Sequence, residues 1–336
     1  MAKPIPTIKE IARKLNVSAS TVSRALHDHP RIGLKTKERV KKLAGELGYE
    51  PNSQAIFFKQ QKTFVIGVIL PSIREEFFSQ AISGIEAVTT QSDYTILFAQ
   101  SYDDYKREVI VAETMKRQRV DGLIISLSKE TTKLQHLEAF KEMNIPVVYF
   151  DRVPAGDACH KVSCNMKTGT VEMIHWLFSE GLKRIAIING PKALFASKER
   201  LAGYMEGMQQ HKLKVDMQLV EETDFSEDST YKAVSNLLSL KKLPQAIISF
   251  NDYVHMDAVK AALKKKVKVN RDLLFVSYSN LNITGYTSYP PAASIEQYPY
   301  EQGKMAAEIL FQLLNNKQNT DQSYIRQQLI PKLVLH

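Results

Sequence analysis

From Phe64 onward, short apolar runs alternate with amphipathic segments of helical period, and this alternation constrains the fold more than any other feature of the chain. A run that is apolar throughout predicts a strand buried on both faces, as in a parallel sheet covered by helices. The alternation passes through two successive stretches of similar length. The sequence therefore predicts an α/β core of two doubly wound parallel-sheet lobes.

The expected elements follow one another along the chain. In the first half, strands 64–70, 94–100, 121–127 and 146–151 alternate with helices 77–89, 105–117 and 132–143. In the second half, helices 167–179, 198–210, 229–238 and 256–264 alternate with strands at 184–190, near Leu219, at 245–250 and at 273–278. The late segments 292–297 and 329–336 are too short for a domain. We expect the lobes to span about 63–161 with 289–320, and 162–288 with 321–336.

The segment Thr7 to Leu26 predicts two short helices joined by a tight turn. Thr7 and Glu10 form a capping-box pattern, and Asn16 tolerates the left-handed backbone that ends a helix. Ser18 is a suitable cap for the second helix, whose Val22, Ala25 and Leu26 would face inward. This spacing predicts a helix-turn-helix within an all-α headpiece, residues 1–50.

The second helix would present small polar residues at its start. Ala19 suits a thymine methyl, Ser20 and Thr21 suit a base or phosphate, and Arg24 suits guanine O6 and N7. The alternative is a helical hairpin that packs on another domain and leaves Arg24 solvated.

The charge distribution favours DNA binding. Residues 1–62 contain 13 Lys and Arg against 5 Asp and Glu, a net charge of +8, whereas the whole chain carries +9. Almost all the basic excess therefore lies with the helix-turn-helix, as neutralising backbone phosphates requires.

A third helix is expected at 36–47, followed by a linker at 51–62. Pro51 and Asn52 mark a helix start, yet so short an isolated helix is unstable in water. The linker also places Ile56, Phe57 and Phe58 in a row. We interpret it as a hinge helix that orders on DNA and wedges an apolar group between base pairs. The alternative is a linker that packs these groups on its own domain.

Several functional classes lack support in the sequence. No apolar run is long enough to span a membrane, and the first residues contain no secretory signal. Cys159 and Cys164 are too few for a disulfide framework and fit a reducing cytoplasm. No phosphate loop, GxGxxG, HExxH or GxSxG motif occurs, so neither an enzyme nor a bound cofactor is expected. His27 and His29 do not complete a metal site.

Several motifs together resemble the LacI/GalR (lactose/galactose repressor) family of transcription regulators. The most specific are TIKEIARKLNVSASTVSRAL and KERVKKLAGELGYEPN. The others are FVIGVILP followed by FF, DR at 151–152, RLAGY at 200–204, ND at 251–252 and the late EQGKMAAEIL. The resemblance implies a repressor with a periplasmic-binding-protein-like core. It would bind a near-palindromic operator as a homodimer and be controlled by a small sugar-like metabolite in the cleft between the lobes.

The resemblance also implies roles for individual residues. Bases would be read by Ala19, Ser20 and Arg24, phosphates would be held by Thr7, Thr21 and Ser23, and Phe58 would be the wedge. With the cap Ser18 and the linker residue Asn52, these are the candidate DNA-binding residues. The implied effector-binding residues are Phe77, Phe78, Asp151, Arg200, Phe225, Asn251 and Ser279.

Three positions depart from the family pattern. Ser279 replaces an Asp that grips the sugar, Cys164 replaces an Asp before Asn165, and the loop PKALFAS is more apolar than usual. The effector could therefore be anionic or more apolar instead of a neutral sugar. The sequence is also compatible with control by a protein partner, with lobes that bind no ligand, and with a sugar-binding module whose headpiece is vestigial.

Overall fold

The computed structural model describes residues 6–49, 62–316 and 323–336, and the chain divides into two compact units, 1–63 and 64–336. The first unit is the predicted helical headpiece, with helices α1 (Ile8–Leu15), α2 (Ala19–Leu26) and α3 (Leu34–Leu47). Its small core contains Ile11, Val22, Ala25 and Val40, all fully buried.

The predicted caps of the headpiece helices are present. The Thr7 hydroxyl accepts a hydrogen bond from the Glu10 amide (3.3 Å), and Asn16 ends α1 in the left-handed conformation. The Glu10 carboxylate pairs with Lys14 (3.5 Å), although the capping box predicted a bond back to the Thr7 amide. α3 begins at Leu34, two residues before the predicted start. Because the Leu34 side chain is exposed, it adds nothing to the apolar period that marks the helix.

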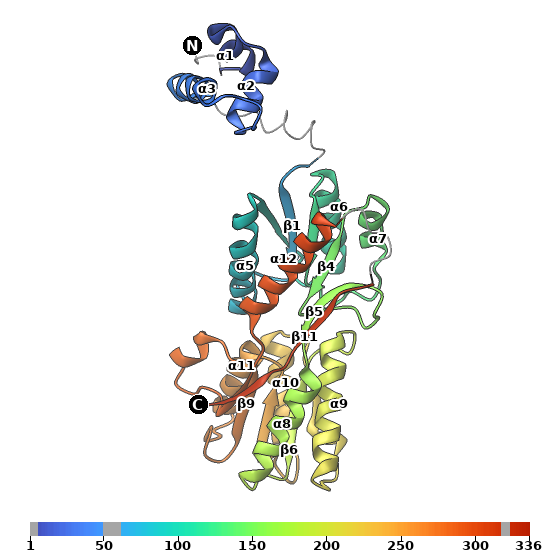
Figure 1. The fold of residues 1–336 in the computed structure, drawn as a ribbon. Coiled ribbons are helices and arrows are strands. Elements are labelled where there is room, and N and C mark those ends of the chain that lie inside the picture. The colour runs from blue at the N-terminus through green and yellow to red at the C-terminus, as the bar shows by residue number, and fades with distance from the viewer. Residues whose placement is uncertain (1–5, 50–61, 317–322) are drawn as a thin grey trace. The chain divides into compact units, whose positions relative to one another are not determined.

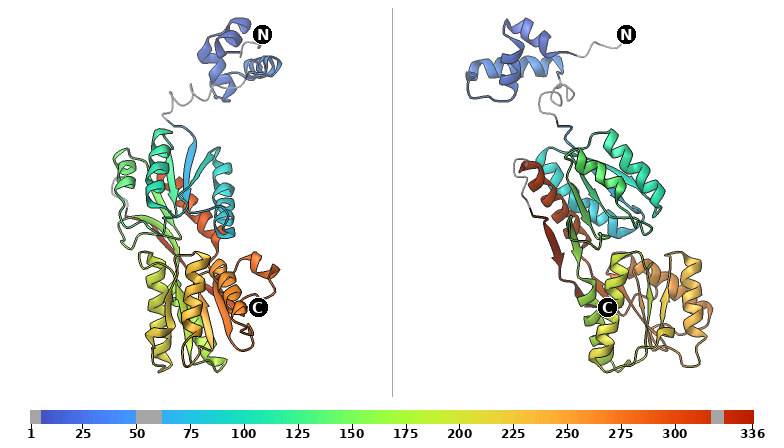
Figure 2. Two further views of the ribbon diagram at one scale, coloured as in Figure 1. Left: turned by 180° about the vertical axis from the view of Figure 1, so that it is seen from behind. Right: turned by 90° about the vertical axis from the view of Figure 1, so that its right-hand side faces the viewer.

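The second unit contains two six-stranded sheets among its described residues, each covered by helices on both faces (Figures 1 and 2). The sheet of lobe 1 has the order β11-β5-β4-β3-β1-β2 and is parallel throughout. The sheet of lobe 2 has the order β12-β10-β9-β8-β6-β7, in which only β12 is antiparallel. These sheets confirm the predicted fold class.

The strands are β1 (Val65–Leu70), β2 (Thr95–Gln100), β3 (Gly122–Ile125), β4 (Val147–Phe150), β5 (His160–Cys164), β6 (Ile185–Asn189), β7 (Val220–Glu222), β8 (Ala246–Ser249), β9 (Leu274–Ser279), β10 (Ala293–Glu296), β11 (Arg326–Leu329) and β12 (Lys332–Leu335). The helices of this unit are α5 (Glu76–Thr89), α6 (Tyr105–Arg117), α7 (Gln135–Glu142), α8 (Met166–Ser179), α9 (Phe195–Gln210), α10 (Glu227–Leu238), α11 (Asp252–Lys264) and α12 (Pro299–Asn315), with short 3-10 turns η1 (Thr90–Ser92), η2 (Met217–Leu219) and η3 (Asn282–Tyr286).

The structure corrects the assignment of three segments to the lobes. β5 lies in the sheet of lobe 1, so the chain leaves lobe 1 after Cys164 and not after residue 161. β10 belongs to lobe 2 and β11 to lobe 1, the reverse of the expectation. β5 and β11 were hard to place because HKVSC and RQQL contain no apolar run. The chain thus crosses between the lobes three times, after β5, after β10 and after β11.

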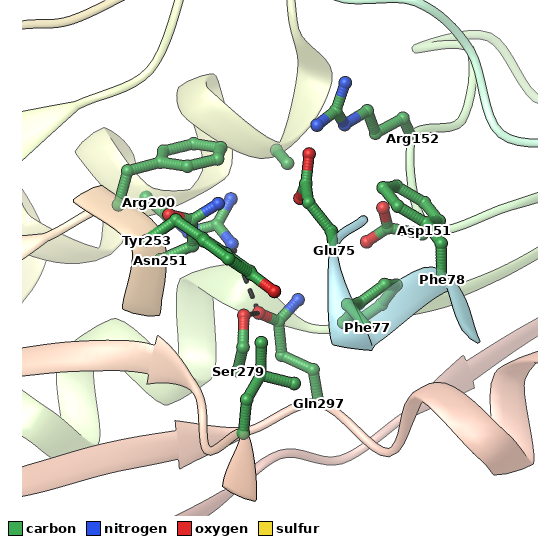
Figure 3. A pocket seen from close by; sticks show the side chains of 13 residues that line it. Glu75, Phe77, Phe78, Asp151, Arg152, Arg200, Asn251, Tyr253, Ser279 and Gln297 are labelled. Atoms are coloured by element: carbon green, nitrogen blue, oxygen red, sulfur yellow. Dashed lines mark hydrogen bonds between the residues drawn. The ribbon is translucent and has the colours of Figure 1, made fainter. Parts of the chain in front are cut away.

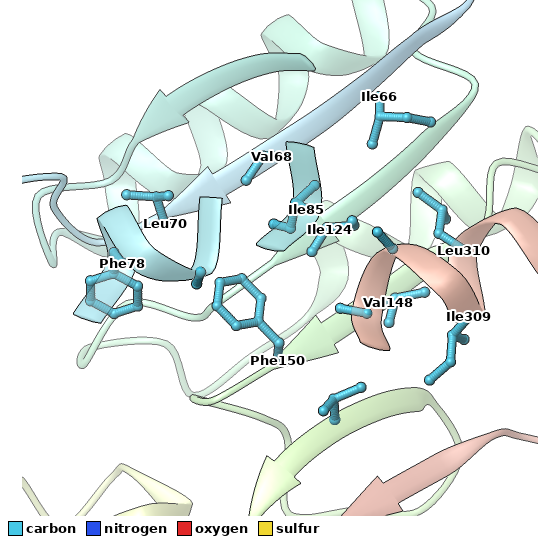
Figure 4. Close-up of a cluster of buried hydrophobic side chains, with 14 of the residues drawn as sticks. Ile66, Val68, Leu70, Phe78, Ile85, Ile124, Val148, Phe150, Ile309 and Leu310 are labelled. Carbon is cyan, nitrogen blue, oxygen red and sulfur yellow. The ribbon is translucent and has the colours of Figure 1, made fainter. Parts of the chain in front are cut away.

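The core of lobe 1 joins the two ends of this unit. Its buried cluster combines strand residues such as Ile66, Val68 and Phe150 with Leu310 of α12 (Figure 4). α12 approaches α5 so closely that a Cβ at Gly84 would lie 2.0 Å from the Tyr300 carbonyl oxygen. Only glycine allows the two helix backbones to meet in this way. This contact fixes α5, which carries two residues of the cleft described below.

Two negative findings apply to the described residues. Within ranges 6–49, 62–316 and 323–336, no helix has the length and hydropathy needed to cross a bilayer. In the same ranges, His, Cys, Asp and Glu side chains nowhere gather in threes as a metal site would require. Cys159 and Cys164 are both free thiols.

Candidate DNA-reading helix and effector cleft

The start of α2 forms a compact polar surface on the headpiece. The Ser18 hydroxyl accepts a hydrogen bond from the Thr21 amide (3.0 Å) and contacts the hydroxyls of Ser20 (2.7 Å) and Thr21 (2.8 Å). Ser18 therefore holds the first turn of the helix together. Ser20 and Arg24 are exposed, whereas Thr21 and Ser23 are half-buried.

Two of the candidate DNA-binding residues have structural duties as well. Ala19 is half-buried and packs against the headpiece core, so it points less toward solvent than the helical period predicted. Thr7 is exposed and also caps α1. Asn52 and Phe58, together with the proposed hinge helix, lie outside the described residues.

The second unit contains a cleft where the carboxyl ends of the strands of both lobes meet (Figure 3). This cleft encloses about 410 Å³ of empty space, open solvent included. All the predicted effector residues except Phe225 line it, namely Phe77, Phe78, Asp151, Arg200, Asn251 and Ser279. Ligands in open α/β folds bind at this edge of the strands.

Arg200 is the most unusual side chain of the cleft. It is 3% exposed, and its guanidinium lies between the rings of Phe250 (4.0 Å) and Tyr278 (4.5 Å). Its Nη2 donates a long hydrogen bond to Gln297 (3.5 Å), whereas Nε and Nη1 have no partner among the described residues. A buried donor without an acceptor costs free energy, so these two groups are free for a ligand.

The position of Arg200 within α9 differs from the expectation. The predicted helix began at Lys198, which placed Arg200 in the first turn against the helix dipole. α9 begins at Phe195, so Arg200 lies in the second turn, where the dipole has little effect. The case for Arg200 therefore rests on its unpaired N–H groups and not on the dipole.

Phe77 and Phe78 both belong to the buried core of lobe 1 and both line the cleft. Their rings meet edge to face at 5.3 Å, and Phe78 also contacts Phe150 at 6.4 Å. At the start of α5 the core continues into the wall of the cleft, so the two roles coincide.

The cleft also contains two half-buried carboxylates. Burial raises the pKa of Glu75 to about 7 and that of Asp151 to about 6, although the nearby Arg152 guanidinium opposes both shifts. The Glu75 carboxylate points toward Arg152 (Figure 3), which forms an ion pair with Asp103. Asp151 has a left-handed backbone (φ 56°) that turns the chain at the end of β4. These groups present both acceptors and donors to the cleft.

Replacing Glu75 by Gln should remove a pH dependence of stability. The pKa of Glu75 rises from 4.5 when unfolded to about 7 when folded, so the folded state binds more protons and loses stability as pH rises through this interval. At about 1.4 kcal/mol per pKa unit, the wild type loses up to about 3 kcal/mol. Urea unfolding should therefore show Glu75→Gln more stable than the wild type at pH 8, with a much smaller gain at pH 5. Equal gains at both pH values would contradict the assignment.

Ser279 and Asn251 are held in place by their neighbours. The Ser279 hydroxyl donates a hydrogen bond to the Gln297 side chain (3.1 Å), and Ser279 has a positive φ of 97°. The Asn251 side-chain oxygen caps α11 by accepting from the Val254 amide (2.9 Å), which starts this helix four residues before the prediction. Asn251 also lines the cleft.

Phe225 is the effector candidate that the structure places elsewhere. Its ring packs on Phe250 (4.8 Å) and lies 5.5 Å from the Arg152 guanidinium, outside the lining of the cleft. Phe250 thus occupies the aromatic position that Phe225 was expected to fill. Since both rings crowd Gly190, a side chain there would displace them.

Further cleft residues were not predicted as site residues: Glu75, Arg152, Ala196, Phe250, Tyr253, Leu281 and Gln297. Most of them could have been found from their position in the sequence, because they follow a strand directly or lie within two residues of a predicted site residue. Tyr253 also joins the lobes, since its hydroxyl accepts from the Glu76 amide (3.0 Å) and donates to the Arg74 carbonyl (3.1 Å). Lys129 makes a second bridge by donating to the Asp224 carbonyl (2.6 Å).

Comparison with known proteins agrees with this architecture. Residues 7–52 match the family model "Bacterial regulatory proteins, lacI family", and residues 66–318 match the model "Periplasmic binding protein domain". The second match alone covers most of the chain.

Individual relatives extend over nearly the whole length. The transcriptional regulator RegA of Clostridium saccharobutylicum is 29% identical over 95% of this chain and 96% of its own. The transcriptional repressor PurR of Vibrio campbellii is 29% identical over 93% of each chain. Among solved structures, the lac repressor dimer bound to operator and the anti-inducer ONPF has the same fold, with a TM-score of 0.84, 23% identity and 98% coverage of both chains.

The two family models match the chain in the order of its structural units: the lacI model covers the headpiece, and the periplasmic binding protein model covers the two-lobed core. The comparisons identify transcription regulators and not enzymes. The chain belongs to the lacI family of bacterial regulatory proteins and is a transcriptional regulator with a periplasmic-binding-protein-like core.

Proposed function

We propose that the protein acts in the cytoplasm as a homodimer that binds a near-palindromic operator and is controlled by a small polyhydroxylated metabolite, a sugar or a sugar derivative. The dimer places one α2 helix on each half-site. The metabolite binds in the cleft and changes how firmly the dimer holds the operator.

An apolar patch on lobe 1 supports the homodimer. β2 is an edge strand, and its consecutive residues Leu97 and Phe98 are 37% and 48% exposed. Consecutive strand residues point to opposite faces, so the middle of β2 is partly exposed on both sides. Ile73 and Tyr102 are also exposed. The Gln100 side chain of β2 accepts a hydrogen bond from the Ile73 amide and donates one to the Tyr102 hydroxyl. We call Ile73, Leu97, Phe98 and Tyr102 the β2 patch. A second copy of the chain would remove this edge from water.

The surface of α2 supports direct reading of DNA. Arg24 is exposed and suits the two acceptors of guanine, while Ala19 and Ser20 are small enough for close approach to base edges. Thr7, Thr21 and Ser23 carry hydroxyls suited to phosphate oxygens. Asn52 and Phe58 keep their proposed roles at the hinge helix and the central base step.

The observation that carries the effector assignment is the buried guanidinium of Arg200 with two unpaired N–H groups. A hydroxyl-rich ligand offers acceptors to Arg200 and donors to Asp151 and Glu75. Phe77 and Phe250 supply the aromatic faces that cover the apolar face of a sugar ring. A purely apolar ligand would leave all three charged groups unsatisfied.

Control follows from linkage between the cleft and the operator. A ligand that contacts both lobes shifts the equilibrium between their arrangements only by the difference in its affinity for each. That coupling acts equally in the reverse direction, so the operator changes ligand affinity by the same factor. Induction and corepression are the two signs of one coupling.

Selection of genomic DNA fragments by the purified protein would test the proposal. Bound fragments should share a near-palindrome, and the neighbouring genes would suggest metabolites for titration against the complex. A metabolite that changes operator affinity at least fivefold is expected, in the range of ordinary allosteric coupling. Fragments without symmetry, or binding indifferent to every sugar in a broad panel, would refute it.

Replacing Arg24 by Ala should weaken operator binding and relax specificity at one base pair in each half-site. A lost bidentate contact costs about 1–3 kcal/mol, and the dimer loses two. Operator affinity measured by fluorescence anisotropy should fall by tenfold or more, while affinity for random DNA falls far less. Arg271→Ala, which changes an exposed arginine of lobe 2, is the matched control. Equal losses on operator and random DNA would show that Arg24 contacts only phosphates.

A further inference from the structure

A second cavity lies between the lobes, next to the effector cleft. It encloses about 900 Å³ of empty space, open solvent included, against about 410 Å³ for the cleft. Arg152 lines both cavities, so the two are neighbours. We call this cavity the side compartment. Its apolar wall consists mainly of Leu127, Leu134, Val153, Leu194 and Phe195.

Both lobes contribute to the apolar wall. Leu127 and Val153 are buried in a hydrophobic cluster of lobe 1, at the ends of β3 and β4. Phe195 starts α9 in lobe 2, yet its side chain packs against the same cluster. The Phe195 ring centroid also lies 5.9 Å from the Lys161 ammonium. An apolar group in the compartment would therefore contact both lobes at once.

The charge of the side compartment differs from that of the cleft. The cleft contains Glu75 and Asp151, whereas the lining of the side compartment contains no carboxylate and two cations, Arg152 and Lys198. Arg152 is already paired with Asp103. The remaining polar groups are mainly hydroxyls such as Ser128 and Thr131. This lining suits an uncharged apolar group and disfavours a cation.

Of the two cavities, the polar cleft has the smaller empty volume, and the larger neighbouring space is lined mostly by apolar residues. We propose that the effector is amphipathic, with a polyhydroxylated head in the cleft and an apolar arm about the size of a phenyl ring in the side compartment. This inference rests on the proposed function and specifies its ligand class. The arm would couple ligand binding to lobe closure, because Phe195 and Val153 approach it from opposite lobes.

Matched pairs of methyl and phenyl glycosides test this inference. Burying a phenyl group contributes about 1.5–3 kcal/mol, so the phenyl glycoside of the preferred sugar should bind roughly ten- to a hundredfold more tightly than its methyl partner in calorimetry. Ala193→Trp, which fills the compartment from an exposed lining residue, should abolish this gain and retain methyl glycoside binding. Ala202→Trp, at an exposed residue of α9 outside the lining, should retain both.

The outcomes separate the two proposals. Equal affinity for both members of every pair that binds would overturn the amphipathic effector and leave the proposed sugar-responsive function intact. Absence of binding by any glycoside would instead count against the proposed function.

If no glycoside binds, a dye measurement still tests whether the side compartment accepts apolar groups. The fluorophore 1-anilinonaphthalene-8-sulfonate, whose aromatic rings brighten in apolar surroundings, should brighten with the wild type and with Ala202→Trp. At least half of the signal should be lost with Ala193→Trp, because tryptophan occupies the apolar space. Equal signals from all three proteins would overturn the assignment of the side compartment as a site for apolar groups.

Discussion

Replacing Phe98 by Glu is expected to convert the protein into a monomer that has lost most of its affinity for the operator. Phe98 is 48% exposed on the edge strand β2 and forms part of the β2 patch. In the proposed dimer this ring would be buried against the partner copy. A carboxylate there would have to be desolvated without a cation to pair with it, at a cost of several kcal/mol for each copy.

The loss of dimerisation should be visible on DNA. A dimer binds its second half-site at high effective concentration, so the monomer should bind the full operator about 10²–10⁴-fold more weakly. Sedimentation would give the oligomeric state and anisotropy the affinity. Met143→Glu is the control, since Met143 at the end of α7 is also 48% exposed and lies outside the β2 patch. A dimeric Phe98→Glu protein with unchanged operator affinity would exclude the β2 patch as the interface.

Replacing Arg200 by Met is expected to stabilise the protein and abolish its response to the effector. The wild-type fold buries a guanidinium whose Nε and Nη1 have no partner among the described residues. Each unpaired buried donor costs about 1–3 kcal/mol. Methionine would still pack between Phe250 and Tyr278 but would lose the cation–π contacts, worth about 0.5–2 kcal/mol. We expect a net increase in the free energy of unfolding of about 1–3 kcal/mol by urea titration.

The effect of Arg200→Met on ligand binding should be opposite in sign. Two hydrogen bonds from a charged group contribute at least about 3 kcal/mol, so effector affinity should fall by about a hundredfold or more. Arg200→Lys is the informative control. It retains a buried charge but not the planar fork, so it should lose affinity without gaining stability. A destabilised Arg200→Met protein would show that Arg200 is structural.

The helices of the core were predictable where the sequence carries both a periodic face and a cap. α6 begins and ends at the predicted residues, Tyr105 and Arg117, because Asp104 caps it and Ala112 and Met115 lie on its buried face. The buried strands β1, β6 and β8 were found for a similar reason. Their apolar runs reflect burial on both faces, which a single sequence records directly.

The strands β5 and β11 were missed or misplaced for the opposite reason. They pair with each other through backbone groups, and their side chains give no apolar run. Backbone pairing leaves no mark on residue type. The assignment of β10 failed because sequence order does not say to which of two similar sheets a late strand returns.

The residues of the cleft were likewise only partly predictable from the sequence. Asp151 ends a predicted strand, and Asn251 and Ser279 each follow one, so their convergence at one edge could be expected from topology alone. Gln297 follows β10, the strand that had been assigned to the other lobe, and it is the residue that bonds both Ser279 and Arg200. Phe225 also follows a strand, β7, yet Phe250 stands between it and the cleft. Which of the two rings lines the cleft depends on side-chain packing, which the sequence does not reveal.

The three crossings between the lobes have a consequence for biosynthesis. The sheet of lobe 1 needs β11 and the sheet of lobe 2 needs β12, and both strands lie within residues 326–335. During translation neither lobe can close its sheet until those residues have left the ribosome, whereas the headpiece emerges first and depends on neither. The nascent chain should therefore carry a finished DNA-reading module ahead of an unfinished core. Because that core cannot yet complete the lobe that bears the β2 patch, pairing with a second chain would have to wait until β11 has emerged.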